Sequence, residues 1–411
     1  MNVLFLSPWL PWPPFGGALI RILETLRVVS RRHRVTLLTL LRDPEQAQHV
    51  KELDPLCDLV ITTVLSDDTL PVVARLSAGL THRRPLIQSM HYDSTLAEHV
   101  SRLTSQNRYD IIHVEFSFMA PYLDSVSPSS QAKTVLVMHN VESLRFRREI
   151  RFAKGARRLA LLTDHLLFKT WEERAMRRFD GIVAVSPLEQ RWIQEQAPGA
   201  ATELLPNGVN IGQFAPVAGA GPSRTILFTG LMNYPPNIDA VVWFCNSVLP
   251  IIHRTHPDVQ FKIVGDKPPR SVLALRARPG VTVTGRVPDV RPYMTECLGL
   301  VVPVRSGAGT RLKILEAMAM RRPVVSTSVG AEGLDVAPGR NILLGDTPEA
   351  LAAHVISLIE HPDLADRLGS AGRNLVQANY DWSACLAGLE GLYQSLARST
   401  PSRLTARSKV S

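Results

Sequence analysis

One segment of the chain carries residue types that suit a phosphorylated ligand. In VVPVRSGAGTRLKILEAMAM (301–320), an apolar run is followed by a loop with two glycines and then by good helix formers. This order predicts a strand, a loop of small residues and the start of a helix. Glycines let backbone N–H groups approach an anion closely, and a helix N-terminus favours negative charge. We therefore expect phosphate to bind along the loop formed by Gly307, Ala308, Gly309 and Thr310.

Charged side chains surround this loop. Arg311 and Lys313 add donors suited to a diphosphate, and Arg305 is a further candidate just ahead of the loop. Glu316, one turn into the expected helix, can accept hydrogen bonds from two vicinal hydroxyls such as those of a ribose. The set predicts a nucleoside diphosphate site. The alternative interpretation is a glycine-containing loop with solvated charges.

The end of this segment resembles part of a known motif. Glu316-Ala-Met-Ala is similar to the C-terminal half of the E-x7-E motif of family 4 glycosyltransferases, the retaining, nucleotide-sugar-dependent group with the GT-B fold. The likeness is to the branch found in bacterial exopolysaccharide assembly. The first Glu of the motif would fall at position 308, where this chain has Ala308. Backbone amides of 307–310 would then replace the usual contact of that Glu with the transferred sugar.

The resemblance implies a hexosyltransferase that moves a sugar from a nucleoside diphosphate sugar to a glycan or lipid-linked acceptor. In the family mechanism the acceptor hydroxyl attacks from the face that the diphosphate leaves, and the departing phosphate oxygen takes its proton, so the anomeric configuration is retained. No cofactor is implied beyond the nucleotide-sugar co-substrate, and no Asp-x-Asp suggests a metal. The resemblance gives catalytic roles to four residues: His139, Arg311, Lys313 and Glu316.

Length and composition indicate a globular protein of two domains. The 411 residues exceed one ordinary core, and 45% are hydrophobic against 20% charged. The four cysteines are widely spaced, so we expect neither a disulfide framework nor a metal cluster, and a reducing compartment fits. Val3–Leu6 is too short for a signal peptide, and no apolar stretch approaches the ~18 residues of a membrane span. We therefore expect a cytoplasmic protein.

Apolar runs alternate with helical patterns along the chain, which predicts α/β domains with doubly wound parallel sheets. Strands are expected at Val3–Leu6, Val35–Leu40, Leu59–Val64, Ile111–Val114, Val135–Met138 and Gly181–Val185, and then at Arg224–Thr229, Gln260–Val264, Val281–Thr284, Gly299–Val302, Pro323–Thr327 and Asn341–Leu344. The resemblance predicts two Rossmann-like domains that face a cleft. The expected parts are an acceptor-side domain at 1–205, a nucleotide-sugar-binding domain at 206–379, a helix at 380–398 that crosses back to the first domain, and a disordered tail at 399–411.

In the first domain, candidate site residues follow the expected strands. Gly16 and Gly17 precede a helix, and in the family such a pair lies near the donor diphosphate and the acceptor; the alternative is a tight turn. His139 comes directly after a strand, where open α/β sheets bind ligands, and the family's His contacts the transferred sugar. Glu115 ends the preceding strand. We expect Glu115 and Asn140 to bind acceptor hydroxyls.

In the second domain, the diphosphate clamp of many family members is replaced. Where they carry Arg and, five residues later, Lys, this chain has Leu231 and Pro236. We therefore infer that phosphate binding has moved to Arg311 and Lys313. The resemblance places further donor contacts, including those to the nucleobase, on Gly230, Asn233, Asn237, Gly265, Arg286 and Val287.

Positive charge is concentrated in Leu144–Arg178. This segment holds eleven Lys or Arg against four acids, a local charge of +7 in a chain total of +9. Leucines recur there at helical spacing, as a basic amphipathic helix resting on the anionic inner face of a membrane would require. The alternative is a core-packed helix with a solvated basic face. The aromatic residues lack the stacking pattern of a nucleic-acid module, so nucleic acid is not an expected partner.

Two other functions share these observations. A nucleotide-sugar 2-epimerase has the same fold and would release product from the donor alone. A catalytically silent nucleotide-sugar-binding partner in a polysaccharide assembly complex would explain Ala308 and the lost clamp, and would bind donor without turnover.

Overall fold

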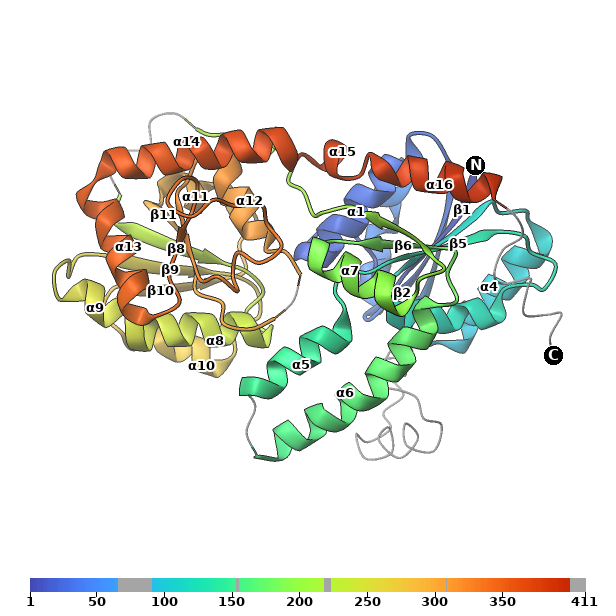
Figure 1. Cartoon of the computed structure of the whole chain (residues 1–411), viewed down its shortest axis with the longest axis horizontal. Coiled ribbons are helices and arrows are strands. Elements are labelled where there is room, and N and C mark those ends of the chain that lie inside the picture. The colour runs from blue at the N-terminus through green and yellow to red at the C-terminus, as the bar shows by residue number, and fades with distance from the viewer. Residues whose placement is uncertain (66–90, 153–154, 218–222, 308, 400–411) are drawn as a thin grey trace. The chain divides into compact units, whose positions relative to one another are not determined.

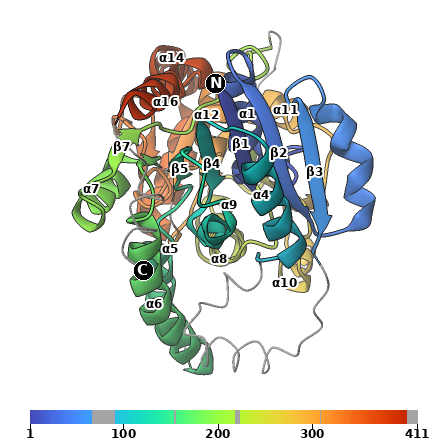
Figure 2. The ribbon, with the colours of Figure 1, turned by 90° about the vertical axis from the view of Figure 1, so that its right-hand side faces the viewer.

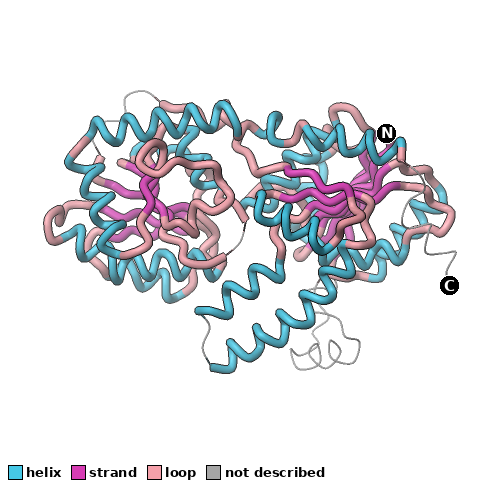
Figure 3. Tube along the Cα trace, viewed as in Figure 1, coloured by secondary structure: helices cyan, strands magenta, loops and turns pink. Residues whose placement is uncertain are grey.

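The computed structural model describes residues 1–65, 91–152, 155–217, 223–307 and 309–399. Its chain forms two compact units, Met1–Pro206 with Leu386–Ser411 (unit 1) and Asn207–Cys385 (unit 2). Each unit has strands at its centre and helices around them (Figure 3). Nearly all of the expected tail and position 308 lie outside the described residues.

Unit 1 contains a seven-stranded parallel sheet in the order β3-β2-β1-β4-β5-β6-β7. Its central strands are almost fully buried on both faces, as a parallel sheet covered by helices requires. The chain leaves β1 toward β2 and β3 and then returns to β4, so the order switches between β1 and β4. The strands are β1 Asn2–Ser7, β2 Arg34–Leu41, β3 Leu59–Val64, β4 Ile111–Glu115, β5 Lys133–Val137, β6 Gly181–Ala184 and β7 Ala201–Leu204.

Helices cover both faces of this sheet (Figures 1 and 2). Two of them, α5 and α6, pack against each other and extend away from the sheet as a helical pair. The helical segments are α1 Gly17–Ser30, η1 Pro44–Leu53, α4 Ser94–Gln106, η2 Ser117–Ser125, α5 Glu142–Phe152, α6 Gly155–Met176, α7 Pro187–Gln196 and α16 Gly388–Arg398.

Unit 2 contains a six-stranded parallel sheet in the order β10-β9-β8-β11-β12-β13, with the switch between β8 and β11. Its strands are β8 Thr225–Thr229, β9 Gln260–Val264, β10 Val281–Gly285, β11 Gly299–Val302, β12 Val324–Ser326 and β13 Leu343–Leu344. Its helical segments are α8 Pro235–Trp243, η3 Phe244–Val248, α9 Leu249–His253, α10 Arg270–Leu273, η4 Ala274–Ala277, α11 Arg291–Glu296, α12 Leu312–Ala319, α13 Pro348–Glu360, α14 Pro362–Asn379 and α15 Trp382–Cys385. The α/β class with two doubly wound parallel sheets is confirmed.

The end of the chain differs from the single helix expected at 380–398. The structure divides this segment into α15, which belongs to unit 2, and α16, which belongs to unit 1. Leu389, Leu392 and Leu396 bury the apolar face of α16 against unit 1. Among the described helices, none combines the length and the apolar composition that crossing a membrane would need.

Candidate active site

In unit 2, the loop between β11 and α12 has the conformation that its glycines predict. Gly307 has φ +114° and Gly309 has φ +75°, a region that other residues rarely adopt. A Cβ at Gly307 would lie 2.9 Å from the Arg311 guanidinium. Arg311 itself is the N-cap of α12, and its guanidinium donates to the Gly309 carbonyl. Arg311 therefore supports the loop from within, and the Thr310 hydroxyl lies 2.6 Å from the Asn207 side-chain nitrogen.

Lys313 and Glu316 lie on one face of α12, while the apolar residues of this helix are buried against the sheet. Lys313 Nζ lies 3.2 Å from Asn237 Oδ1 and 3.9 Å from the centre of the Phe228 ring. Burial lowers the pKa of Lys313 to about 7; Arg311 lowers it further, and Glu316 opposes the shift. Burial likewise raises the pKa of Glu316 to about 7 against the effect of Lys313. A bound anion would favour the charged ammonium.

Two strand ends of unit 2 lie close together beside the Lys313 ammonium. Gly230, after β8, has φ +150°, and a Cβ there would lie 2.8 Å from Lys313 Nζ and 2.9 Å from Asn237 Nδ2. A Cβ at Gly265, after β9, would lie 1.7 Å from the Gly230 carbonyl oxygen. Asn237 donates to the Leu231 carbonyl at 2.8 Å, which fixes its oxygen toward Lys313. The structure thus brings Gly230, Gly265, Asn237 and Lys313 together. The sequence alone placed these four residues in separate loops and helices.

Arg305 does not have the surroundings expected of a phosphate-binding helper. Its guanidinium makes two bonds to the Asp239 carboxylate, at 3.0 and 2.6 Å, and stacks 4.7 Å from the centre of the Trp243 ring. This bidentate pair uses Nε and one terminal nitrogen of the guanidinium. Arg305 thus joins the loop to α8, and its expected contact with phosphate stays a prediction.

Asn233, Arg286 and Val287 are the other donor candidates of unit 2. Asn233 is exposed in the turn before α8, and Arg286 and Val287 follow β10 at the edge of the sheet, with Arg286 exposed. Their proposed donor contacts stay predictions. Ala308 lies outside the described residues.

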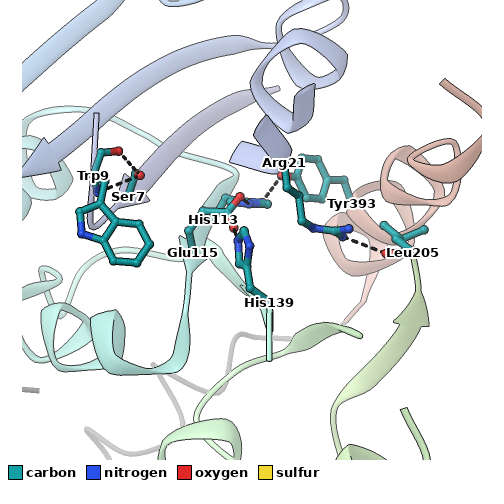
Figure 4. A network of polar contacts seen from close by, with 8 residues as sticks. All are labelled: Ser7, Trp9, Arg21, His113, Glu115, His139, Leu205 and Tyr393. Carbon is teal, nitrogen blue, oxygen red and sulfur yellow. Dashed lines mark hydrogen bonds and ion pairs between the residues drawn. The ribbon is translucent and has the colours of Figure 1, made fainter. Parts of the chain in front are cut away.

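In unit 1, His139 and Glu115 follow neighbouring parallel strands, and their side chains meet. His139 Nε2 lies 2.5 Å from Glu115 Oε2, and Glu115 Oε1 lies 3.0 Å from His113 Nε2 (Figure 4). Glu115 is completely buried. Although burial alone would raise its pKa, His139 and His113 outweigh this and hold the pKa at about 2. Burial lowers the pKa of His139, against the opposing effect of Glu115.

These contacts correct the role expected for Glu115. Its carboxylate is inaccessible, and both oxygens bond to histidines, so it cannot meet an acceptor hydroxyl. It orients His139 instead. The ring of Phe116 supports the same histidine from one face, at 3.9 Å between centroids and an angle of 6°, with Phe116 held at φ +70°. Asn140 stays partly exposed beside His139.

The backbone after His139 is held by two more buried carboxylates. Glu189, on α7, accepts from the Val141 N–H at 3.2 Å. Glu172, on α6, accepts from the N–H groups of Glu142 and Ser143, both at 3.1 Å, and so caps the start of α5. Burial raises the pKa of Glu172 to about 7, an effect that the Ser143 bonds partly offset.

The glycine pair of unit 1 lies at the carboxyl end of β1, beside the switch point. Gly16 has φ +93° and is the N-cap of α1, and Gly17 begins the helix with its backbone exposed.

The sequence analysis did not predict the network of residues that supports His139. His113 and Glu115 alternate on β4 and therefore share a face, which was a usable signal. Nothing local pointed to Tyr393, whose Oη lies 2.6 Å from His113 Nδ1.

Two doubly wound units, each with polar residues and glycines at the carboxyl ends of its strands, define a two-domain α/β protein of the GT-B type. Sucrose-phosphate synthase from Thermosynechococcus elongatus has the same fold, with a TM-score of 0.72 and 20% identity over 96% of this chain and 99% of that one. HepE from Anabaena, solved with UDP and glucose, gives a TM-score of 0.68 and 16% identity over 96% and 100% of the two chains.

Residues 15–213 match the family described as Glycosyltransferase Family 4, and residues 223–361 match the family described as Glycosyl transferases group 1. The two matches together cover most of the chain, which therefore belongs to the GT-B glycosyltransferases that join these two domains.

Curated relatives match over part of their length. A protein of the cps region of Klebsiella pneumoniae is 27% identical over 38% of this chain and 42% of its own. The phosphatidyl-myo-inositol mannosyltransferase of Propionibacterium freudenreichii is 27% identical over 51% of this chain and 55% of its own. The chain thus spans between about two fifths and just over half of these relatives.

Proposed function

We propose that this chain is a retaining, metal-independent hexosyltransferase. It moves a sugar from a nucleoside diphosphate sugar to a glycan or lipid-linked acceptor in polysaccharide biosynthesis. The observation that carries the proposal is the half-buried Lys313 ammonium of unit 2, which lies beside Gly230, Asn237 and the Phe228 ring. An ammonium whose pKa has fallen to about 7 gains from an anionic ligand, and bare backbone lets a diphosphate approach it closely.

The residues then divide the chemistry. Lys313, Arg311 and the backbone of Gly307, Gly309 and Thr310 stabilise the diphosphate as its charge develops, and Arg311 also bonds to that loop. Glu316 accepts from the ribose hydroxyls, and in unit 1 His139 contacts the transferred sugar. The bond from the anomeric carbon to the phosphate oxygen breaks as the acceptor oxygen forms its bond. The acceptor proton passes to the departing phosphate oxygen.

The names of the relatives support the proposed pathway class. They include a Klebsiella pneumoniae protein of the cps region, a mannosyltransferase that acts on phosphatidyl-myo-inositol, and a putative teichuronic acid biosynthesis glycosyltransferase of Bacillus subtilis. The last is 31% identical over 33% of this chain and 35% of its own. Two of the three names, the phosphatidyl-myo-inositol mannosyltransferase and the teichuronic acid biosynthesis glycosyltransferase, describe sugar transfer.

We further propose that α6 brings the protein to an anionic membrane surface. Leu166 is 67% exposed and Leu162 is 38% exposed, so these two leucines lie on the outward face of the helix. Arg158 and Lys169 are also exposed and lie on the same face at helical spacing. Phe168, in contrast, is fully buried and packs against Phe146. The outward face of α6 thus combines apolar and cationic side chains, the composition that binds anionic lipid.

A panel of UDP-, GDP- and ADP-sugars tests the proposed donor site, with the melting temperature of the protein as the readout. A donor that binds the native state must raise this temperature by mass action. One nucleotide series that gives a clear rise supports the proposal. No rise with any member at millimolar concentration contradicts it. A rise in melting temperature with a donor that is not then turned over favours the catalytically silent nucleotide-sugar-binding partner. Ala308 and the loss of the usual diphosphate clamp are the reasons to consider that alternative.

A further inference from the structure

We infer that Tyr393, on the C-terminal helix α16, is a positioning residue that fixes the tautomer and the orientation of His139 through His113 and Glu115. The inference rests on the proposed function, in which His139 contacts the transferred sugar. It adds three supporting residues to that contact, one of them contributed by α16.

Four side chains form a continuous polar chain inside unit 1 (Figure 4). Tyr393 Oη lies 2.6 Å from His113 Nδ1, His113 Nε2 lies 3.0 Å from Glu115 Oε1, and Glu115 Oε2 lies 2.5 Å from His139 Nε2. The first three side chains are completely buried, and His139 is 7% exposed. Since a buried polar group without a partner is costly, each member depends on its neighbours for hydrogen bonding.

The chemistry of the groups sets the direction of every bond. An ionised carboxylate only accepts, so both histidines must donate to Glu115 through Nε2–H. We infer that the Tyr393 hydroxyl donates to His113 Nδ1, which in the Nε2–H tautomer carries a lone pair. Tyrosine is well suited here because its O–H can donate from a rigid ring that α16 packs in place. A phenylalanine at this position would leave a buried acceptor without its donor.

For His139 the result is a single tautomer in a single orientation. Nε2 carries the proton, and Nδ1 presents a lone pair that has no hydrogen-bond partner within the part of the chain that the structure describes. Phe116 stacks on one face of the ring at 3.9 Å, so the ring is held at its edge and at its face. His139 therefore offers an acceptor, which suits a hydroxyl group of a sugar as its donor.

The helix that supplies Tyr393 is itself anchored at two further points. Leu389, Leu392 and Leu396 are buried, and Leu392 and Leu396 limit the space around Gly181 on β6. Glu390 on the solvent side of α16 lies 2.7 Å from His33 Nε2. These contacts fix the position of α16 in unit 1 and so the position of the Tyr393 hydroxyl. In the sequence, α16 follows the residues of unit 2.

Selective ¹⁵N-histidine labelling tests the tautomers without any ligand. Long-range ¹⁵N–¹H spectra distinguish the two neutral tautomers, and His139→Gln and His113→Gln assign their signals among the twelve histidines. We expect wild-type His139 and His113 to be protonated on Nε2 and bare on Nδ1. Tyr393→Phe should shift the signals of both residues. Tyr109→Phe removes a hydroxyl that bonds Thr36 elsewhere in unit 1, and should leave them unchanged.

Two results would overturn the inference. One is a His139 protonated on Nδ1 in the wild type, a result that needs the glutamine variants only to assign the signal. The other is a folded Tyr393→Phe whose His139 signals match the wild type. In slow hydrolysis of UDP-glucose or GDP-mannose, we expect Tyr393→Phe to lower kcat about tenfold with KM nearly unchanged. If the wild type hydrolyses neither sugar while the spectra show the expected tautomers, the polar chain stands and the proposed function does not.

Discussion

Removing the charge of Lys313 should weaken nucleotide binding without disturbing unit 2. Lys313→Met keeps an unbranched apolar stem over the Phe228 ring and deletes the ammonium that lies 3.9 Å from that ring and 3.2 Å from Asn237. A charge-assisted hydrogen bond to phosphate is worth about 1.5–3 kcal/mol. We therefore expect the Kd for UDP or GDP, whichever binds the wild type, to rise roughly 10- to 150-fold in isothermal titration calorimetry.

The pH dependence of nucleotide binding provides a second test of the role of Lys313. Only the charged ammonium binds phosphate, and burial has lowered the pKa of Lys313 to about 7 in the free protein. Wild-type affinity should therefore fall as the pH rises above about 7, by up to tenfold per pH unit. Lys313→Met should lack this alkaline fall, because no group at that position loses a proton.

Lys262→Met is the matched control. Lys262 also places its ammonium over an aromatic ring, at 5.4 Å from the centre of Tyr293, but it belongs to β9 and not to the loops at the strand ends. It should bind nucleotide as the wild type does. If Lys313→Met retains wild-type affinity while melting normally, Lys313 does not bind the diphosphate, and the reasoning from its burial is wrong.

Three further predictions address other parts of the structure. Gly230→Ala should weaken UDP or GDP binding at least tenfold in calorimetry, because its Cβ would lie 2.8 Å from Lys313 Nζ in a backbone conformation that disfavours side chains. Glu172→Gln should gain stability relative to the wild type as the pH rises from about 4.5 to 7, by up to about 3 kcal/mol in denaturant unfolding. Leu166→Glu should reduce flotation of the protein with phosphatidylglycerol vesicles. Leu188→Glu, which changes an exposed leucine of α7, should leave this flotation unchanged.

Each of these three predictions can be contradicted by a specific result. The sign for Glu172 follows from its raised pKa, since the folded protein keeps this proton over a range where the unfolded chain has lost it. A difference in unfolding free energy that stays constant with pH would show that Glu172 does not carry the shift. Normal affinity in Gly230→Ala would place the nucleotide elsewhere. Equal flotation of the wild type with neutral and anionic vesicles would remove the membrane proposal.

The sequence predicted the architecture because parallel strands leave a simple pattern. Runs such as Val3–Leu6 and Gly299–Val302 are apolar at every position, as strands buried on both faces must be, and the structure has strands at both. The edge strand β7, Ala201–Leu204, was missed because Ala-Thr-Glu-Leu is partly polar and only four residues long. Edge strands bury one side at most, so their sequences constrain them less.

The site was only partly predictable, because many of its contacts join residues far apart in the sequence. The sequence placed His139 and Glu115 at adjacent strand ends but could not show that Glu115 is buried between two histidines. Tyr393 is 280 residues from its partner His113, and Arg305 is 66 residues from Asp239. Spacing along the chain carries no signal for such pairs. They follow from packing, and packing decided which charges support the site and which remain for a ligand.

The central claim is that the chain transfers a sugar with retention of configuration, and the anomer released in the absence of acceptor tests it most directly. Proton NMR would follow the protein with UDP-α-glucose or GDP-α-mannose, with Lys313→Met as the control for a contaminating hydrolase. We predict slow release of the α-anomer of the unchanged sugar, seen before mutarotation, and much less from the variant. Release of the β-anomer or of a 2-epimerised hexose, or the absence of release from a donor that binds, would contradict the account.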